Sequence, residues 1–499
     1  MDRFIISSKD SMGRFAMKSR FCILILILLP IIMVRPAWVW QQKTESLSYQ
    51  DAQPVLTALA EALPEEFKGK KDAELSEAWS SWLARYELAI KARLLRGDED
   101  SLVNFLFYGT SFTKQRRLSA EDFKSPEVRA KGDSSKSEKP EEIIQRRMRD
   151  LVEALLLPGK NERLQLLRNL LEERGHSLST PSGQAAATSY IVDCVVRVLQ
   201  ESQRYAENLH ASRRSGDPAA EFTERSTLFR NRGISLDTSL LPGFAVEESL
   251  KAMRDRGLIV PGSVRKVAIV GPGLDFTDKD AGFDLYPLQT IQPFALMDSL
   301  IRTGLAHPDR LEVSALDISP RVLDHIAQSR LRASRGGAYT IHLVRDSKLP
   351  WRLDSSRYWR RFGDQIGQTV PAAPLPSDLP GQEVRAVRVR PDLVSRLQPV
   401  ALNIVTQHLA LPDSERFDLM IATNIFVYYS VFEQSLALAN VERMLRPGCF
   451  LLSNNALLEL PTSKIHAIDH QTVIYSARPA DGDHILWYQH VTAPASPKD

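Results

Sequence analysis

Cysteine is scarce in this chain, and its scarcity argues against a metal centre. The 499 residues include only three cysteines, at positions 22, 194 and 449. No cluster of cysteine and histidine has the spacing of metal ligands, so we expect no metal site. Cys194 and Cys449 could pair, but two buried free thiols are the interpretation we favour.

An excess of one charge is also lacking. Lysine and arginine number 64 against 61 acidic residues, a formal net charge of +3. So small an excess gives no reason to expect a nucleic acid as partner. With 43% hydrophobic and 25% charged residues, the chain is globular, neither disordered nor a multi-span membrane protein. Its length favours two or more domains.

One uninterrupted apolar run stands near the N-terminus. FCILILILLPIIMV (21–34) follows five basic residues within the first twenty, a pattern that resembles a secretory signal. We therefore predict a signal peptide or signal anchor over 1–40, with membrane attachment through 21–40 if Arg35 extends toward the headgroups. A poor cleavage site favours the anchor. The basic residues ahead of the run place the bulk of the chain outside the cytoplasm.

Residues 41–235 have a helical pattern. In AELSEAWSSWLARYELAIKARLLRG, apolar residues recur every three or four positions, and the final Gly97 predicts the helix end. QAAATSYIVDCVVRVLQESQRYAENL behaves likewise. The charged stretch 124–142 between them is predicted to be a flexible linker. This region is either a partner- or substrate-binding module or a packing domain without chemistry, and we favour the second.

The pattern changes at residue 236. From there to 490, short β-branched runs alternate with helices, which predicts an α/β domain with a doubly wound parallel sheet. The expected strands are 267–270, 311–316, 401–409, 417–423 and 449–454, and the expected helices are 290–304, 319–333 and 430–445. Ser319 is predicted to be a helix N-cap, and Ser430 with Glu433 fits a capping box. The runs 472–477 and 484–490 predict a terminal hairpin, followed by a disordered tail over 491–499.

A glycine turn follows the first expected strand. KVAIV leads into Gly271-Pro272-Gly273, and Asp317 ends the next strand. In an open α/β sheet, ligands bind beyond the carboxyl ends of the strands, at the point where strand order reverses. The glycines would let the backbone approach a ligand closely, and the carboxylate of Asp317 could accept hydrogen bonds from ribose hydroxyls. The order of these features predicts a nucleotide-like cofactor.

A later segment distinguishes between cofactors. RFDLMIATNIFVYYS, then a helix, then LRPGCFLLSNN, resembles the later half of the class I S-adenosylmethionine-dependent methyltransferases, in which an F-D-hydrophobic strand and a helix precede L-x-P-G-G. Cys449 replaces the second glycine. Residues 424–429 are locally similar to the chemotaxis-receptor branch. The terminal hairpin agrees with the antiparallel strand inserted in that family's Rossmann-like sheet. The resemblance covers about 236–490.

The resemblance implies S-adenosylmethionine as cofactor. It places Gly271, Gly273 and Asp275 in the cofactor loop, Asp317 at the ribose, and His408 at the adenine. A structural histidine is the stronger alternative for His408.

The same resemblance puts the methyl acceptor, whose identity it does not give, beside Asn424 and Tyr428. We expect these two residues to orient the acceptor as catalytic residues. The alternatives are a core tyrosine and a turn-forming asparagine.

The sequence departs from the family pattern in three ways. Asp275 stands where a third glycine is usual, and Asp317 follows Gly271 at more than twice the usual separation of about 20 residues. Insertions at 276–288 and 338–400 are either lids or substrate loops, or surface elaborations.

The predicted export of a domain that uses a cytoplasmic cofactor leaves other hypotheses open. One is a degenerate Rossmann-like binding or structural module, tethered to the membrane and without methyl transfer. Another is an NAD-dependent oxidoreductase, which shares the first strand and Asp317 but does not explain LRPGC or the hairpin.

Overall fold

The computed structural model describes residues 43–59, 62–118, 122, 139–215, 232–277, 283–374, 381–478 and 481–491. These residues all belong to one compact unit. The predicted signal segment 1–40, most of the linker 124–142 and most of the predicted tail lie outside the described residues. In the described part of the chain, none of the helices has the length and hydropathy needed to cross a membrane.

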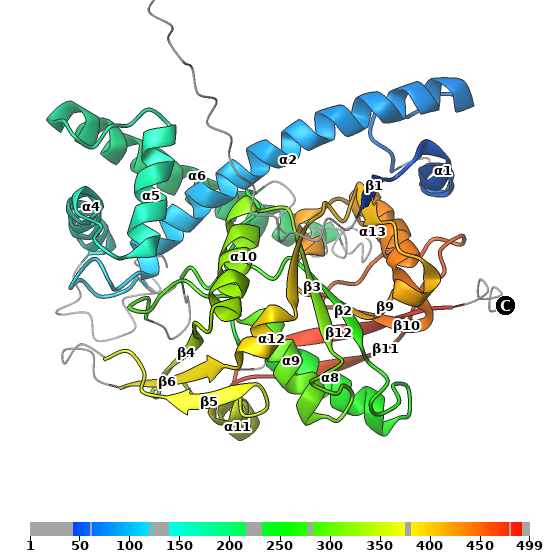
Figure 1. The fold of residues 1–499 in the computed structure, drawn as a ribbon. Coiled ribbons are helices and arrows are strands. Elements are labelled where there is room, and N and C mark those ends of the chain that lie inside the picture. Colours follow the sequence, from blue (N-terminus) through cyan, green and yellow to red (C-terminus); the bar gives the residue numbers. More distant parts are fainter. Residues whose placement is uncertain are drawn as a thin grey trace, which may run out of the picture. The chain divides into compact units, whose positions relative to one another are not determined.

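A mixed sheet of seven strands forms the centre of the α/β region (Figure 1). Its order is β11-β12-β10-β9-β2-β3-β7. The five strands from β10 to β7 pair in parallel, while β12 lies antiparallel between β10 and β11. The expected terminal hairpin and its inserted antiparallel strand are therefore confirmed. The bounds are β2 Lys266–Val270, β3 Glu312–Asp317, β7 Leu397–Ala401, β9 Phe417–Ala422, β10 Leu445–Ser453, β11 Ile465–Ile474 and β12 Gly482–His490.

The central strands are apolar on both faces because both faces are covered. Side chains alternate along a strand, so Val267 and Ile269 of β2 enter one hydrophobic cluster while Ala268 and Val270 enter another. This double burial explains why β2 and β9 have almost uninterrupted apolar sequences. The first cluster includes α8 (Leu241–Asp255), α9 (Gln292–Arg302) and α10 (Pro320–Ser334), and the second includes α13 (Val431–Met444). The capping box of Ser430 and Glu433 begins α13 as expected.

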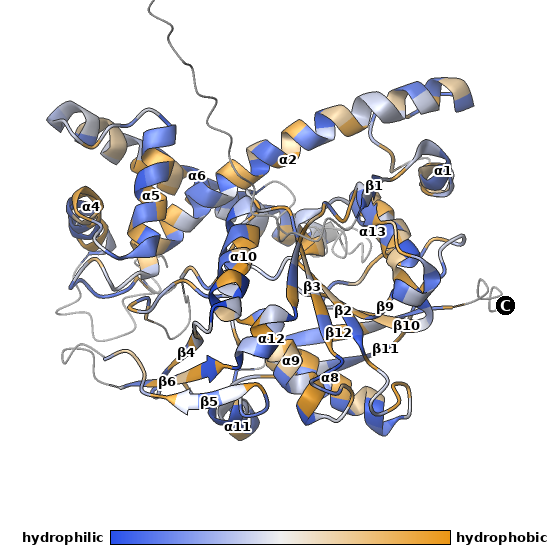
Figure 2. Ribbon diagram, in the orientation of Figure 1, coloured by the Kyte–Doolittle hydropathy of each residue, from blue (hydrophilic) through white to orange (hydrophobic). Residues whose placement is uncertain are grey.

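The region before the sheet is mostly helical. It contains α1 (Tyr49–Ala58), α2 (Asp72–Tyr108), α4 (Pro140–Leu156), α5 (Glu162–Glu173) and α6 (Pro181–Ser215). Its helices share both cores of the sheet: Trp82 of α2 belongs to one cluster and Phe105 of the same helix to the other. Figure 2 shows polar and apolar residues mixed along the whole of α2, which agrees with a helix whose two halves face different cores.

Gly97 does not end a helix, and that prediction is wrong. α2 continues through it to Tyr108. A Cβ atom at Gly97 would lie 1.9 Å from the carbonyl oxygen of Ile234, and the Ile234 amide donates to the Arg93 carbonyl at 3.0 Å. The glycine therefore permits a close crossing of two chain segments.

The predicted strand 401–409 is also wrong. β7 ends at Ala401, and a separate strand, β8 (Gln407–Leu409), pairs with β1 (Thr44–Ser46) outside the main sheet. Between them, the Asn403 side chain accepts from the Val405 amide at 3.1 Å. Such local bonding by asparagine favours a turn over a continued strand.

The insertion at 338–400 folds into a small sheet of its own. It contains β4 (Tyr339–Asp346), α11 (Leu353–Arg361), β5 (Gly367–Val370), β6 (Gln382–Val389) and α12 (Pro391–Ser395), with strand order β4-β6-β5 and antiparallel pairing.

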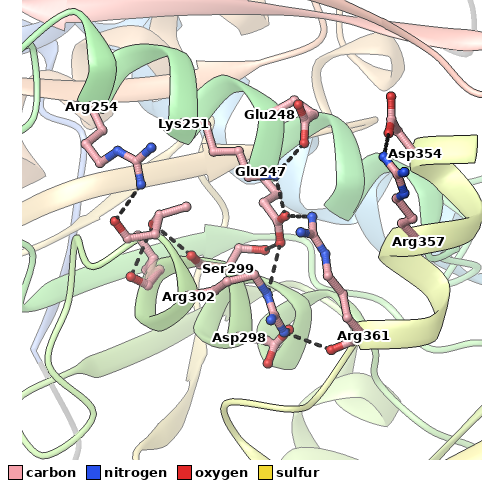
Figure 3. Close-up of polar contacts among 12 residues, drawn as sticks. Glu247, Glu248, Lys251, Arg254, Asp298, Ser299, Arg302, Asp354, Arg357 and Arg361 are labelled. Atoms are coloured by element: carbon pink, nitrogen blue, oxygen red, sulfur yellow. Dashed lines mark hydrogen bonds and ion pairs between the residues drawn. The ribbon is translucent and has the colours of Figure 1, made fainter.

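A buried carboxylate anchors this insertion to the main body (Figure 3). Glu247 of α8 is fully buried, accepts from the Ser299 hydroxyl at 3.0 Å and pairs with Lys251 at 2.9 Å. It also pairs with Arg361 of the insertion. Arg302 of α9 donates to the Arg361 carbonyl at 2.8 Å. A carboxylate this deep requires several charged partners, so the network fixes α11 against α8 and α9.

The two described cysteines are free thiols, Cys194 buried and Cys449 half-buried. Burial raises the pKa of each to about 11. Both are therefore protonated at neutral pH and unsuited to nucleophilic chemistry.

Candidate functional site

A cavity of about 770 Å³ opens at the carboxyl ends of β2, β3 and β9. β2 lies between the other two strands, so the cavity occupies the point where strand order reverses, the usual ligand position in such sheets. Its volume is in the range of small-molecule sites. Five of the predicted site residues line it, namely Gly271, Gly273, Asp317, Asn424 and Tyr428.

Both glycines of the turn have left-handed backbone, with φ of 65° at Gly271 and 63° at Gly273. Glycine adopts this conformation without steric cost. A Cβ atom at Gly271 would lie 2.1 Å from Cδ1 of Ile425, and one at Gly273 would lie 2.7 Å from the Leu236 carbonyl oxygen. The expected close approach to the turn is therefore made by other parts of the chain.

Asp317 both lines the cavity and ties two loops together. Its carboxylate accepts from the Ser319 amide at 2.7 Å and from the amides of Gly273 and Ile318. Burial raises the pKa of Asp317 to about 6, although these amides act in the opposite direction. Ser319 occupies the N-cap position of α10 as expected, but its side chain makes no capping bond. The polar contact at this helix start comes from Asp317 instead.

Asp275 does not line the cavity, and its placement gives no support to a cofactor contact. Its side chain is 5% exposed and accepts from the Tyr286 hydroxyl at 2.7 Å and from the Gln289 amide group at 2.8 Å. The carboxylate therefore braces the cofactor loop from within the protein.

His408 is also not among the cavity-lining residues. It sits on β8 opposite Glu45 of β1, with its Nε2 atom 3.9 Å from that carboxylate. Burial lowers the pKa of His408. Because β7 ends at Ala401, the residues that follow it into the cavity are Leu402 and Ile404. If the end of β7 had been predicted correctly, Leu402 and Ile404 would have been candidate site residues.

Asn424 has a strained backbone at the cavity. Its φ of 59° is the only positive value at a non-glycine residue among those described. Its amide donates to the Asn454 side chain at 2.8 Å, and Asn454 donates back to the Asn424 side-chain oxygen at 2.6 Å. Asparagine tolerates left-handed backbone better than most residues, and such strain gathers at functional sites.

Tyr428 ends a short 3₁₀ turn (η3, Phe426–Tyr428) that follows β9. Burial, followed by the nearby charge of Asp237, raises the pKa of Tyr428 to about 12. The phenol is therefore protonated at neutral pH, so it can donate a hydrogen bond but is no general base.

Two buried arginines of the helical region hold the loops that line the cavity. Arg163 of α5 is 1% exposed and donates to the carbonyls of Asp275, Phe276 and Tyr286 at 3.1, 2.8 and 2.5 Å. It also lies over the Tyr286 ring, 5.0 Å from the centroid. In addition, the amides of residues 110 and 111 donate to Asp284 at 2.9 and 2.8 Å. The described ends of the insertion at 276–288 are thus firmly attached to the helices.

The second arginine, Arg93 of α2, holds the loop after β9. Its guanidinium donates to the carbonyls of Tyr428 and, at 3.4 Å, Arg232. It also lies over the Tyr429 ring at 5.8 Å from the centroid. Sequence reasoning missed both arginines, since isolated arginines in amphipathic helices carry no local mark of the carbonyls they contact.

The helical region also supplies one wall of the cavity, which sequence reasoning missed as well. α2 contributes Leu94, Leu95 and Asp98, and the segment 234–239 adds backbone and side chains. None of the described residues of the insertion at 338–400 lines the cavity, whereas Thr277 at the start of the first insertion does. The described residues contain no group of three or more potential metal ligands.

No protein-family model and no curated protein matches the sequence. Solved structures similar to this one include the magnesium protoporphyrin IX methyltransferase of Synechocystis PCC 6803 with bound S-adenosylmethionine, at 12% identity and a TM-score of 0.24, covering 50% of this chain and 80% of that one. A glycopeptide N-methyltransferase complexed with S-adenosylmethionine shows 16% identity and a TM-score of 0.21, covering 52% and 71%. The CcbJ methyltransferase of Streptomyces caelestis shows 14% identity and a TM-score of 0.21, covering 51% of this chain and 80% of that one. TM-scores of this size establish no shared fold, so the description of the sheet rests on its strand order.

Proposed function

We propose that the protein is an S-adenosylmethionine-dependent methyltransferase. The observation that carries the proposal is the meeting of Gly271, Gly273 and Asp317 at one cavity, at the carboxyl ends of neighbouring parallel strands. The antiparallel strand β12, inserted beside β10, agrees with the sheet that the sequence resemblance implies.

Each part of the chain has a role in this proposal. Asp317 would accept hydrogen bonds from the cofactor ribose, and Leu402 and Ile404 would pack beside its base. When bound, S-adenosylmethionine supplies a methyl group already activated by a sulfonium. The protein's own task is therefore to orient an acceptor and exclude water. Asn424 and the protonated phenol of Tyr428 would orient the acceptor through hydrogen bonds.

Membrane attachment through residues 21–40, with the bulk of the chain outside the cytoplasm, stays a prediction from the sequence. It conflicts with a cytoplasmic cofactor, so either the domain faces the cytoplasm or the cofactor site has degenerated.

A degenerate binding module is the second candidate, and two observations favour it. Ile425 and the Leu236 carbonyl already fill the space beside the two glycines. The carboxylate of Asp317 already accepts three backbone amides, and a carboxylate has about four acceptor positions.

Calorimetric titration of the full-length protein in detergent separates the candidates. The methyltransferase proposal expects binding of S-adenosylmethionine and its demethylated product, and no binding of NAD. Asp317→Asn keeps the shape of the side chain but loses its charge, and it should weaken binding about tenfold, or 1.4 kcal/mol. No binding at millimolar cofactor would replace the enzyme by the degenerate module, and binding of NAD alone would point to an oxidoreductase.

A further inference from the structure

The cavity has two chemically different sides. Gly271, Asp317 and Leu402 lie on the side that follows β2, β3 and β7, where the proposed function places the cofactor. The other side is built by α2, which contributes Leu94, Leu95 and Asp98. The second side has no role in cofactor binding as proposed above.

The α2 side is a fixed wall. The guanidinium of Arg93 holds the Tyr428 carbonyl, and its backbone carbonyl accepts from the Ile234 amide at 3.0 Å. The two segments also cross closely at Gly97 and Gly233, where a Cβ atom at Gly233 would lie 2.2 Å from the Gly97 nitrogen. A wall held in this way encloses a small ligand better than it admits a folded macromolecule.

This side combines apolar groups with an excess of carboxylates. Leu94, Leu95, Ile234 and Ile425 supply apolar surface. The lining on this side includes three acidic residues, Asp98, Glu173 and Asp237, against one cation, Lys91. Arg321 and Asp324 belong to α10, which follows β3 on the cofactor side. Arg321 is already paired with Asp98 at 3.3 Å. The remaining field favours a positively charged ligand.

Thr277, in the loop after β2, provides an independent indication that something polar binds in the cavity. Its side chain is 3% exposed and lines the cavity, yet its hydroxyl has no hydrogen-bond partner in the described structure. Buried hydroxyl groups without a partner are uncommon in folded proteins, and a polar group of a bound molecule would satisfy this one.

We propose that the α2 side of the cavity is the acceptor subsite and that the acceptor is a small, mainly apolar molecule carrying a cationic amine. The proposal rests on the methyltransferase function and adds the chemical class of its acceptor. The amine is the group by which the carboxylates recognise the molecule, and Leu94 and Leu95 pack against its apolar body.

Titration of 2-phenylethylamine into the full-length protein, saturated with S-adenosylhomocysteine, tests the charge preference. 2-Phenylethanol and 3-phenylpropanoate serve as probes of similar size that are neutral and anionic. We expect the amine to bind at least tenfold more tightly than the alcohol, and the carboxylate to bind weakest. Equal binding of the three, or a preference for the alcohol, the carboxylate or a lysine-containing peptide, would overturn the proposal.

Two matched variants test the location. Leu95 is 39% exposed and lines the cavity, whereas Leu88 is 65% exposed on the same helix and does not. Leu95→Trp should lower the affinity for the amine at least tenfold and leave that for S-adenosylhomocysteine within twofold, while Leu88→Trp changes neither. Leu95→Phe, a milder change, should give a smaller loss in the same direction if the tryptophan variant does not fold.

The outcomes distinguish a failure of the acceptor-subsite proposal from a failure of the proposed methyltransferase function. A wild-type protein that fails to bind S-adenosylhomocysteine overturns the proposed function, and the acceptor role falls with it. A protein that binds S-adenosylhomocysteine but not the amine overturns only the acceptor class. A Leu95→Trp variant that loses S-adenosylhomocysteine as well would assign the α2 side to the cofactor and overturn the subsite.

Discussion

The loop after β2 and the loop after β9 meet at the same cavity but are held in different ways. In the first, Arg163 donates hydrogen bonds to three backbone carbonyls. The side chain of Asp275 also accepts a hydrogen bond from Gln289 of the same loop. In the second, Arg93 holds the Tyr428 carbonyl, and the Gln434 side chain of α13 holds the two carbonyls of Phe426 and Tyr429, each at 2.9 Å. This loop also contains the left-handed Asn424. The comparison suggests a rigid first loop, whose fixation contributes to the stability of the fold. The second loop is held largely by the helix that follows it in sequence, and it retains backbone strain beside the cavity.

Breaking the attachment of the first loop should have the largest effect. Arg163→Met keeps much of the apolar stem but leaves three buried carbonyls without a donor. Each unsatisfied group costs about 1–3 kcal/mol, so we expect a loss of at least 3 kcal/mol in the free energy of unfolding, measured by urea denaturation. Arg168→Met on the same helix removes an exposed pair with Glu172 and a long bond of 3.5 Å to the Leu156 carbonyl. It should cost less than about 1 kcal/mol. Equal losses would show that the loop does not depend on Arg163.

The charge of Asp317, which ties the first loop to α10, should make stability depend on pH. Its folded pKa of about 6 lies above the usual value of about 3.9. The folded protein therefore binds more protons than the unfolded chain between these values, and the stability gained from this difference is lost as pH rises through 6. The shift corresponds to roughly 3 kcal/mol at about 1.4 kcal/mol per unit. Urea denaturation between pH 4 and 7 should show that Asp317→Asn removes this pH dependence of the free energy of unfolding. If the variant keeps the pH dependence of the wild type, Asp317 is not its source.

Removing the Arg93 contacts to the second loop should lower the free energy of unfolding by less than removing Arg163 from the first. Arg93→Met leaves the carbonyls of Tyr428 and Arg232 without this donor, and we expect a loss of about 2 kcal/mol in the free energy of unfolding. If the two loops act separately, cofactor affinity should stay within threefold of wild type by calorimetry, while binding of 2-phenylethylamine weakens. A variant that loses cofactor affinity most would show that the two loops move together.

The smallest expected effect measures the strain at Asn424 alone. Asn424→Gly and Asn424→Ala both lose the side-chain contact with Asn454, but only alanine keeps the steric cost of left-handed backbone. The free energy of unfolding of the Asn424→Ala variant should therefore be lower than that of the Asn424→Gly variant by about 1 kcal/mol, measured by thermal or urea unfolding. Equal stabilities would mean that the backbone at Asn424 relaxes in both variants, and the two loops would then differ only in the side chains that hold them.

Much of the sheet followed from the sequence because its information is local. VAIV, LEVSAL and FDLMIAT are apolar throughout, as parallel strands covered on both faces must be. The capping box at Ser430 and the hairpin at the C-terminus likewise depend on residues close in sequence. Local pattern failed at Gly97 and at 401–409, where a contact with Ile234 and the turn at Asn403 prevailed.

Hydrophobic period and turn residues mark strand ends, so the sequence was enough to predict that Gly271, Gly273 and Asp317 end neighbouring strands. The residues that surround them depend on how distant parts of the chain fold together. Arg93 and Arg163 lie far from the loops they hold, and nothing near them in sequence indicates the carbonyls they contact. Asp275 and His408 were predicted from the family resemblance, and packing placed both outside the cavity lining. Strand ends are fixed by short-range backbone preferences, whereas the partners of a buried polar group are fixed by which distant segments fold against it.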